Sequence, residues 1–235
     1  MMLAASIQYT PVLFAALAGW IMCTCLHEFS HALVAYWGGD RSVREKGYLT
    51  LDPTRYIDPV FTLLIPAIIL LIGGFPFPGA SVQIDESRLR SRKWATYVSA
   101  AGPASNGILF LLFCIPLHPS LRLVDPIPDE RPLWIHYFAA MATLNFIAML
   151  FNLLPVPPLD GFGMIEHRLA PETRWKLRQP NVTWMAFIGL MFLINGVPGV
   201  MTLFSRMLHR VCKSIGINPN VLIDGYRLVL YGEAP

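Results

Sequence analysis

The fold of this chain is decided by the stretch "PVLFAALAGWIMCTCLHEFSHALVAYW", residues 11–37. It is longer than the about 20 apolar residues that a helix needs to cross a bilayer, and its first half carries no charged side chain. Its second half nevertheless contains His27, Glu28 and His31. Ionisable groups inside a membrane helix are costly and usually functional. The stretch therefore predicts both a spanning helix and a functional site within it.

The composition of the whole chain is that of a polytopic membrane protein. Of its 235 residues, 54% are hydrophobic and 14% are charged, whereas a soluble domain has about 25% charged residues. The net charge of +3 is small and is not gathered into a basic face, so no nucleic-acid partner is expected. The four cysteines lack CxxC spacing and are expected to be buried free thiols.

Three further segments are long and apolar enough to span a bilayer: 95–117, 134–155 and 182–205. Another apolar segment, 57–75, contains Pro66 at its centre and ends in a Gly/Pro-rich exit. The sequence thus predicts an all-α polytopic membrane protein with about four spanning helices and small β elements in its loops.

The C-terminal tail contains Asp224-Gly225 between two β-prone runs, which predicts a β-hairpin. No polar linker divides the chain before this tail. We expect a single membrane-embedded domain over residues 1–215 and a short tail over 216–235.

The loop charges predict the orientation of the chain in the cell membrane. Lys and Arg are concentrated in loops 38–56, 76–94 and 161–181, whereas loop 118–133 has two basic and three acidic residues. The positive-inside bias places the first three loops in the cytoplasm. Segment 57–75 must then be re-entrant, or must cross the bilayer and be followed by an extended return. The site is expected to face the cytoplasmic side.

The HEFSH motif predicts a metal site. His27 and His31 are four residues apart and project from one helix face, which suits two nitrogen ligands of a tetrahedral zinc ion. Glu28 would stand beside the metal and take a proton from water. The alternatives are polar residues that are buried for packing, a metal-ion transporter and a membrane protein that binds metal without catalysis.

A catalytic zinc site needs a third protein ligand. A longer histidine motif would require histidine at position 37, which is Trp37. Glu166 and His167 are candidates, but they lie in a charged loop. Asp160 is the better candidate because it follows a helix that is interrupted by prolines and precedes Gly161.

A membrane-embedded HExxH followed by "NLLPVPPLDG" (152–161) resembles the site-2 protease family of intramembrane zinc metalloproteases, in its compact bacterial form without a peptide-binding extension. "SAAGPASNG" (99–107) and "LTLDPTRYIDP" (49–59) are similar to other segments of that family. Asp52 and Tyr56, however, stand where many relatives carry asparagine and histidine.

The resemblance implies a role for six residues. His27, His31 and Asp160 would bind one Zn²⁺ per chain, and Glu28 would act first as the catalytic base and then as the acid. The remaining two, Asn106 and Asn152, would bind the substrate or the oxyanion.

The resemblance also implies a protease whose substrates are single-span membrane proteins, cut within or near their spans in the lipid bilayer. Regulation is expected to come from the substrate, from a membrane partner protein or from a first cut that another protease makes in the substrate.

Overall fold

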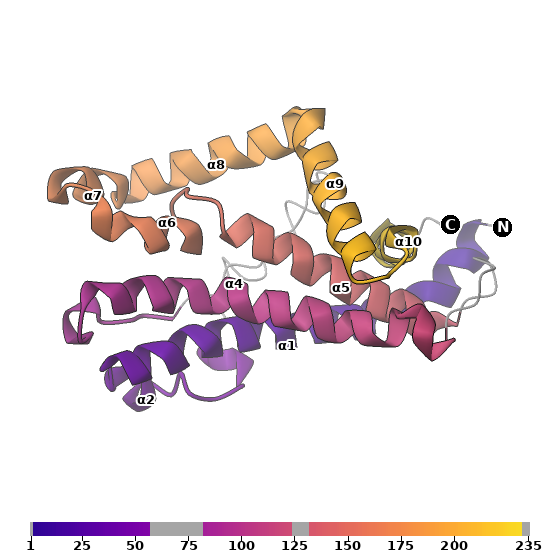
Figure 1. Cartoon of the computed structure of the whole chain (residues 1–235), viewed down its shortest axis with the longest axis horizontal. Helices are drawn as coiled ribbons and strands as arrows, with labels where there is room; N and C mark the ends of the chain where they lie inside the picture. Colours follow the sequence, from indigo (N-terminus) through magenta and orange to yellow (C-terminus); the bar gives the residue numbers. More distant parts are fainter. Residues whose placement is uncertain (1, 57–81, 124–131, 232–235) are drawn as a thin grey trace. The chain divides into compact units, whose positions relative to one another are not determined.

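The computed structural model describes residues 2–56, 82–123 and 132–231 (Figure 1). Within these ranges the chain forms helices and short helical turns. The longer helices are α1 (Met2–Gly38), α4 (Arg92–Cys114), α5 (Leu133–Asn152), α8 (Pro180–Gly196), α9 (Pro198–Ser214) and α10 (Pro219–Tyr231). The shorter elements are α2 (Ser42–Glu45), η1 (Pro53–Arg55), η3 (Glu86–Arg88), η4 (Ile115–Leu117), η5 (Pro119–Leu121), α6 (Asp160–Ile165), η7 (Glu166–Arg168) and α7 (Pro171–Leu177).

The predicted all-α membrane fold is confirmed. Three helical stretches are long and apolar enough to cross a bilayer, namely Pro11–Gly38, Arg92–Leu121 and Leu133–Asn152. Helices α8 and α9 would count as a fourth if the two together make one broken span. Their interruption lies at Pro198, which has no backbone N–H to continue a helix. The predicted re-entrant segment 57–75 lies outside the described residues.

The predicted C-terminal hairpin is wrong, because the tail forms helix α10. The Asn218 side chain accepts a hydrogen bond from the Asn220 N–H at 3.0 Å and so caps the helix start. The buried residues of α10 recur at helical spacing: Val221, Leu222, Gly225, Leu228 and Val229. A Cβ on Gly225 would collide with Ala139 of α5, so this glycine permits close helix packing instead of a turn.

The small β elements predicted in the loops are not found in the part of the chain that the structure describes. Two of these loops form 3-10 turns, η1 and η3, each started by an aspartate. Asp52 accepts a hydrogen bond from the Thr54 N–H, and Asp85 accepts one from the Ser87 N–H. Such local bonds offer the backbone an alternative to strand pairing.

The chain divides into two compact units, and α1, α4 and α5 contribute to both. One unit, unit 1, comprises the first part of α1 up to Cys23, Asn106–Ala148 and the chain from Met201 onward. Helix α5 forms its core, because Ile135, Met141 and Phe146 are almost wholly buried. Phe110 of α4 packs against Phe146, with the ring centroids 5.2 Å apart.

The other unit, unit 2, comprises Thr24–Ser105 and Met149–Val200. One apolar cluster joins the end of α1 to α4 through Ala32, Ala35, Val43 and Val98. A second joins the end of α5 to α8 through Phe151, Leu159, Leu190 and Ile194. These two clusters hold the ends of the three long helices around the polar residues of the first motif.

Asp40, just beyond α1, ties two loops of unit 2 together. Its carboxylate is fully buried and accepts hydrogen bonds from the N–H and hydroxyl of Ser42, at 3.0 and 2.6 Å. Its other oxygen accepts a bond at 2.8 Å from the N–H of Asp85, far along the chain. Asp40 therefore fixes the loop after α1 to the segment that precedes α4.

Replacement of Asp40 by alanine is expected to destabilise the fold by about 3 kcal/mol, because two buried donors of Ser42 and the partly buried N–H of Asp85 lose their acceptor. The apparent Tm of the purified chain in detergent should fall by roughly 5–10 °C. The matched control is Asp52→Ala, since Asp52 makes the same local bonds to Thr54 but is exposed. Equal losses of Tm in the two variants would show that the link to Asp85 contributes nothing.

Candidate metal centre

The C-terminal part of α1 presents both histidines of the HEFSH motif on one face. His27 and His31 have only 8% and 7% of their surface exposed, and Glu28 between them has 5%. Their Nε2 atoms are 3.1 Å apart, as the four-residue spacing of the motif predicts. Three ionisable side chains are therefore buried within little more than one helical turn.

Helix α4 forms the wall against which these histidines pack. The Nδ1 atom of His31 lies 2.6 Å from the carbonyl oxygen of Val98, so Nδ1 carries the proton and donates it to that oxygen. The Nε2 atom is left with a free lone pair. A Cβ on Gly102, one turn further along α4, would lie only 2.5 Å from Nε2 of His27. Only glycine leaves room for the imidazoles at this position.

The turn between α5 and α6 brings in the third side chain. Leu159 is buried in the cluster with Phe151, Leu190 and Ile194, which anchors the turn. Asp160 is the first residue of α6. A Cβ on Gly161 would lie 2.5 Å from the carbonyl oxygen of Leu154, so glycine is needed where α6 starts against the end of α5.

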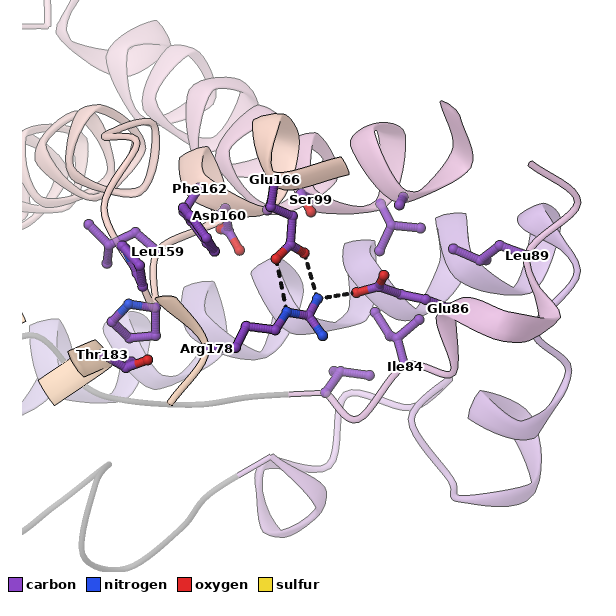
Figure 2. Close-up of a pocket in the computed structure, with 16 residues that line it drawn as sticks. Ile84, Glu86, Leu89, Ser99, Leu159, Asp160, Phe162, Glu166, Arg178 and Thr183 are labelled. Atoms are coloured by element: carbon purple, nitrogen blue, oxygen red, sulfur yellow. Dashed lines mark hydrogen bonds and ion pairs between the residues drawn. The ribbon is translucent and has the colours of Figure 1, made fainter. Parts of the chain in front are cut away.

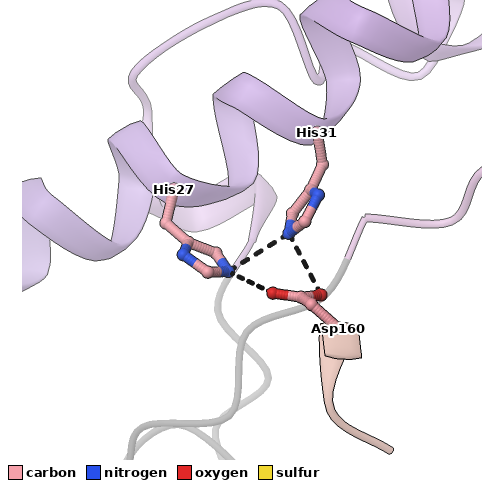
Figure 3. Close-up of side chains that lie close together, drawn as sticks. All are labelled: His27, His31 and Asp160. Atoms are coloured by element: carbon pink, nitrogen blue, oxygen red, sulfur yellow. Dashed lines mark hydrogen bonds and ion pairs between the residues drawn. The ribbon is translucent and has the colours of Figure 1, made fainter. Parts of the chain in front are cut away.

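Asp160 and the two histidines converge on one point (Figure 3). The Oδ2 atom of Asp160 lies 3.1 Å from Nε2 of His27, and its Oδ1 atom lies 3.3 Å from Nε2 of His31. Burial opposes the ionisation of Asp160, but the adjoining imidazoles hold the pKa of this carboxyl below its usual range. The carboxylate is thus available as a charged ligand.

The geometry of these three side chains fits a zinc ion. Tetrahedral coordination at zinc–nitrogen and zinc–oxygen bond lengths separates neighbouring ligand atoms by about 3.4 Å, close to the distances between these atoms. Oδ2 of Asp160 is buried and has no hydrogen-bond donor among the described residues. Two imidazoles and one carboxylate are the ligand types that catalytic zinc sites use. The cluster is the one group of three such side chains in the described ranges that could hold a metal ion.

Glu28 lies beside this cluster without belonging to it. Its carboxyl interacts electrostatically with His27, His31 and Asp160, and it accepts a hydrogen bond from the backbone N–H of Val82. Val82 lies in the non-helical stretch that leads to η3. This backbone contact fixes the carboxyl next to the three converging side chains.

The two other candidates for the third ligand, Glu166 and His167, make contacts away from the cluster. Glu166 is buried and binds Arg178 through both carboxylate oxygens. His167 lies 3.3 Å from the hydroxyl of Thr96. Neither belongs to the cluster, which instead includes Asp160.

The two asparagines that were predicted to bind substrate or the oxyanion lie on α4 and at the end of α5. Asn106 is buried on α4 but falls within unit 1, and Asn152 is partly buried at the end of α5. The sequence analysis missed Val98, Gly102 and Val82. Gly102 could have been found from the "SAAGPASNG" motif. Val98 and Val82 act through a backbone carbonyl and a backbone N–H, which no sequence motif indicates.

The segment around Tyr56 is held by its own contacts. The Tyr56 hydroxyl donates a hydrogen bond to the carbonyl oxygen of Tyr48 at 2.7 Å, and the two rings stack. Burial, together with the nearby Cys25 and Glu28, raises the pKa of Tyr56 to about 12. Tyr56 is therefore a neutral hydroxyl close to Cys25 and Glu28 of α1.

Comparison with known proteins identifies the family. The family model described as "Peptidase family M50" matches residues 127–196. Rip2 of Mycolicibacterium smegmatis, named as a zinc metalloprotease, is 34% identical over 231 residues, which cover 97% of this chain and 84% of that protein. Rip2 of Mycobacterium tuberculosis H37Rv is 38% identical over 82% of this chain and 72% of its own length.

A third relative carries the same kind of name. YwhC of Bacillus subtilis, also named as a zinc metalloprotease, is 35% identical over 68% of this chain and 71% of its own length. No solved structure matches the chain. With more than 30% identity over most of two full-length relatives, the chain belongs to peptidase family M50, the site-2 protease family of zinc metalloproteases.

Proposed function

We propose that this multi-pass membrane protein hydrolyses peptide bonds within or near the transmembrane segments of single-span membrane proteins. His27, His31 and Asp160 would hold one zinc ion, and Glu28 would carry the proton. The observation that supports this proposal best is the convergence of three buried ligand atoms with a buried glutamate beside them. The relatives carry protease names, which favours hydrolysis over metal transport or metal binding without catalysis.

The chain's own residues would each perform a separate part of the reaction. Bound zinc supplies the Lewis acidity that activates water and polarises a carbonyl group. Glu28 takes a proton from the attacking water and later gives it to the leaving nitrogen, so that one carboxyl serves both half-reactions. The hydrogen bond from His31 to Val98 keeps its Nε2 unprotonated for metal binding.

The substrate must present an extended peptide, because helical hydrogen bonds shield a peptide bond from attack. Segment 82–85 supports this proposal, since it is not helical and its residues Val82 and Ile84 line a cavity that Asp160 also lines (Figure 2). An unwound substrate segment could lie along it, as in other forms of strand addition. Asn106 and Asn152 remain the candidates for binding the substrate or the oxyanion.

The active site would face the cytoplasm at the cell membrane. Of the loops that the charge bias assigns to the cytoplasm, 38–56 follows α1, 76–94 leads into α4 and 161–181 follows Asp160 in the sequence. We further propose that residues 1–215 act as one membrane-embedded protease domain, because α1, α4 and α5 each contribute to both compact units.

Removal of the metal tests the proposed function. The purified chain, reconstituted in vesicles with a single-span substrate, should contain one zinc ion and should cleave the substrate. A chelator should abolish cleavage, and one equivalent of zinc should restore it, because the three ligands would then carry no ion. Cleavage that continues after the metal has been removed, or zinc movement across the vesicle membrane without cleavage, would contradict the proposal.

A further inference from the structure

A cavity of about 400 Å³ adjoins the candidate metal centre in unit 2. It lies between the segment that contains Val82, Ile84 and Leu89 and the turn that leads into α6, with α4 as a third side (Figure 2). Slightly more than half of the described lining residues are apolar, among them Val82, Ile84, Val98, Leu159 and Phe162. Because Asp160 also lines it, a peptide that reaches the metal centre can extend into this space.

One end of the cavity is ionic. Figure 2 shows the guanidinium of Arg178 between the carboxylates of Glu166 and Glu86. Arg178 donates from Nε to Oε2 of Glu166 at 2.9 Å and from Nη2 to Oε1 of the same residue at 2.5 Å. The same Nη2 atom also lies 2.5 Å from Oε1 of Glu86. Two carboxylates therefore share a single cation.

The sharing is unequal, and it leaves negative charge on Glu86. The Glu166 side chain is 8% exposed and is bound through both oxygens, so the Arg178 charge chiefly compensates this buried carboxylate. The Glu86 side chain is 44% exposed and uses one oxygen in its pair with Arg178. Arg88, the nearby cation on η3, is turned to Asp85 at 2.9 Å and is not among the described lining residues.

The chemistry of the cavity therefore favours a peptide with an apolar part and an adjacent cation. The ionic end is built from loops 76–94 and 161–181, which are assigned to the cytoplasm. Single-span membrane proteins carry an excess of Lys and Arg just outside their cytoplasmic end. An acidic side chain would be repelled there, since both carboxylates already occupy Arg178.

We infer that Glu86 is a specificity-determining residue, which binds a Lys or Arg of the substrate's cytoplasmic juxtamembrane flank at the outer end of this cavity. This inference rests on the proposed proteolytic function. It adds that the residues next to the substrate's span, and not only those around the cut, determine which proteins are cleaved.

The test uses three synthetic single-span peptides that differ only in a flank of lysines, glutamines or glutamates. In vesicles, the parent protein should cleave the lysine-flanked peptide with about fivefold higher kcat/KM than the glutamine-flanked one, chiefly through KM. Glu86→Gln should remove this preference, so that the lysine-flanked and glutamine-flanked peptides are cleaved with equal kcat/KM. Glu86→Lys should shift the preference to the glutamate-flanked peptide.

The matched control is Glu172→Gln on α7. Glu172 is an exposed carboxylate that pairs with Lys176 and is not among the described lining residues of the cavity. This variant should keep the parental preference for the lysine-flanked peptide. Equal cleavage of the three peptides by the parent protein would overturn the inference while leaving the proposed function intact. Equal loss of kcat/KM on all three peptides in Glu86→Gln would assign Glu86 a structural role and would also overturn it. Failure of the parent protein to cleave any of the peptides would contradict the proposed function itself.

Discussion

Replacement of Glu28 by glutamine is expected to slow peptide hydrolysis roughly a thousandfold while one zinc ion stays bound to each chain. Glutamine has nearly the same shape as glutamate, but its amide cannot accept a proton from water at neutral pH. The three converging ligand atoms belong to other residues and keep their positions. The measurement is single-turnover cleavage of a single-span substrate in vesicles, together with the zinc content of the same preparation.

The separation of activity from metal binding makes this variant informative. Glu45→Gln is the control, because Glu45 is an exposed residue of α2 and its replacement changes the net charge in the same way. That variant should cleave at the parental rate. If Glu28→Gln retains zinc and also cleaves at the parental rate, Glu28 is not the proton carrier. If it loses zinc, its carboxyl instead belongs to the ligand set.

Much of the candidate site could be predicted from the sequence because its spacing rules are local. Two histidines four residues apart must share a helix face, and the structure places His27 and His31 there. Asp160 could be predicted as the third ligand because prolines end the helix before it and Gly161 follows it directly. The contacts that orient the site could not be predicted, since the Val98 carbonyl and the Val82 amide are backbone groups that every residue possesses.

The incorrect predictions concern places where tertiary packing overrides local preference. Asp224-Gly225 has the sequence of a hairpin turn, but the apolar residues around it also fit a helical period of 3.6. The close approach of α10 to Ala139 decides between these two possibilities. Segment 182–205, by contrast, was predicted as one span and stays a candidate span, because α8 and α9 pass the test for a membrane span together although a bend separates them.

Replacement of Asp160 by asparagine is expected to weaken zinc binding at least about a hundredfold, since even changes to groups that only orient metal ligands cost 10- to 100-fold. Asparagine keeps an oxygen at the same place but removes the negative charge that the two neutral imidazoles cannot supply. In a zinc-buffered solution, the purified variant should contain well under one ion per chain. Cleavage should fall with zinc occupancy and should recover in part at high zinc concentration.

Glu166→Gln provides the decisive comparison, because Glu166 is the other acidic candidate for the third ligand. Both of its oxygens hold Arg178, so this variant should lose thermal stability but keep its zinc. Asp160→Asn is therefore expected to lower the zinc content, whereas Glu166→Gln is expected to lower the Tm and leave the zinc content unchanged. Zinc loss in Glu166→Gln with zinc retained in Asp160→Asn would reverse the assignment of the third ligand. Because Asp160 begins α6 and Glu166 directly follows it as the first residue of η7, only this paired measurement separates a lost ligand from a displaced helix.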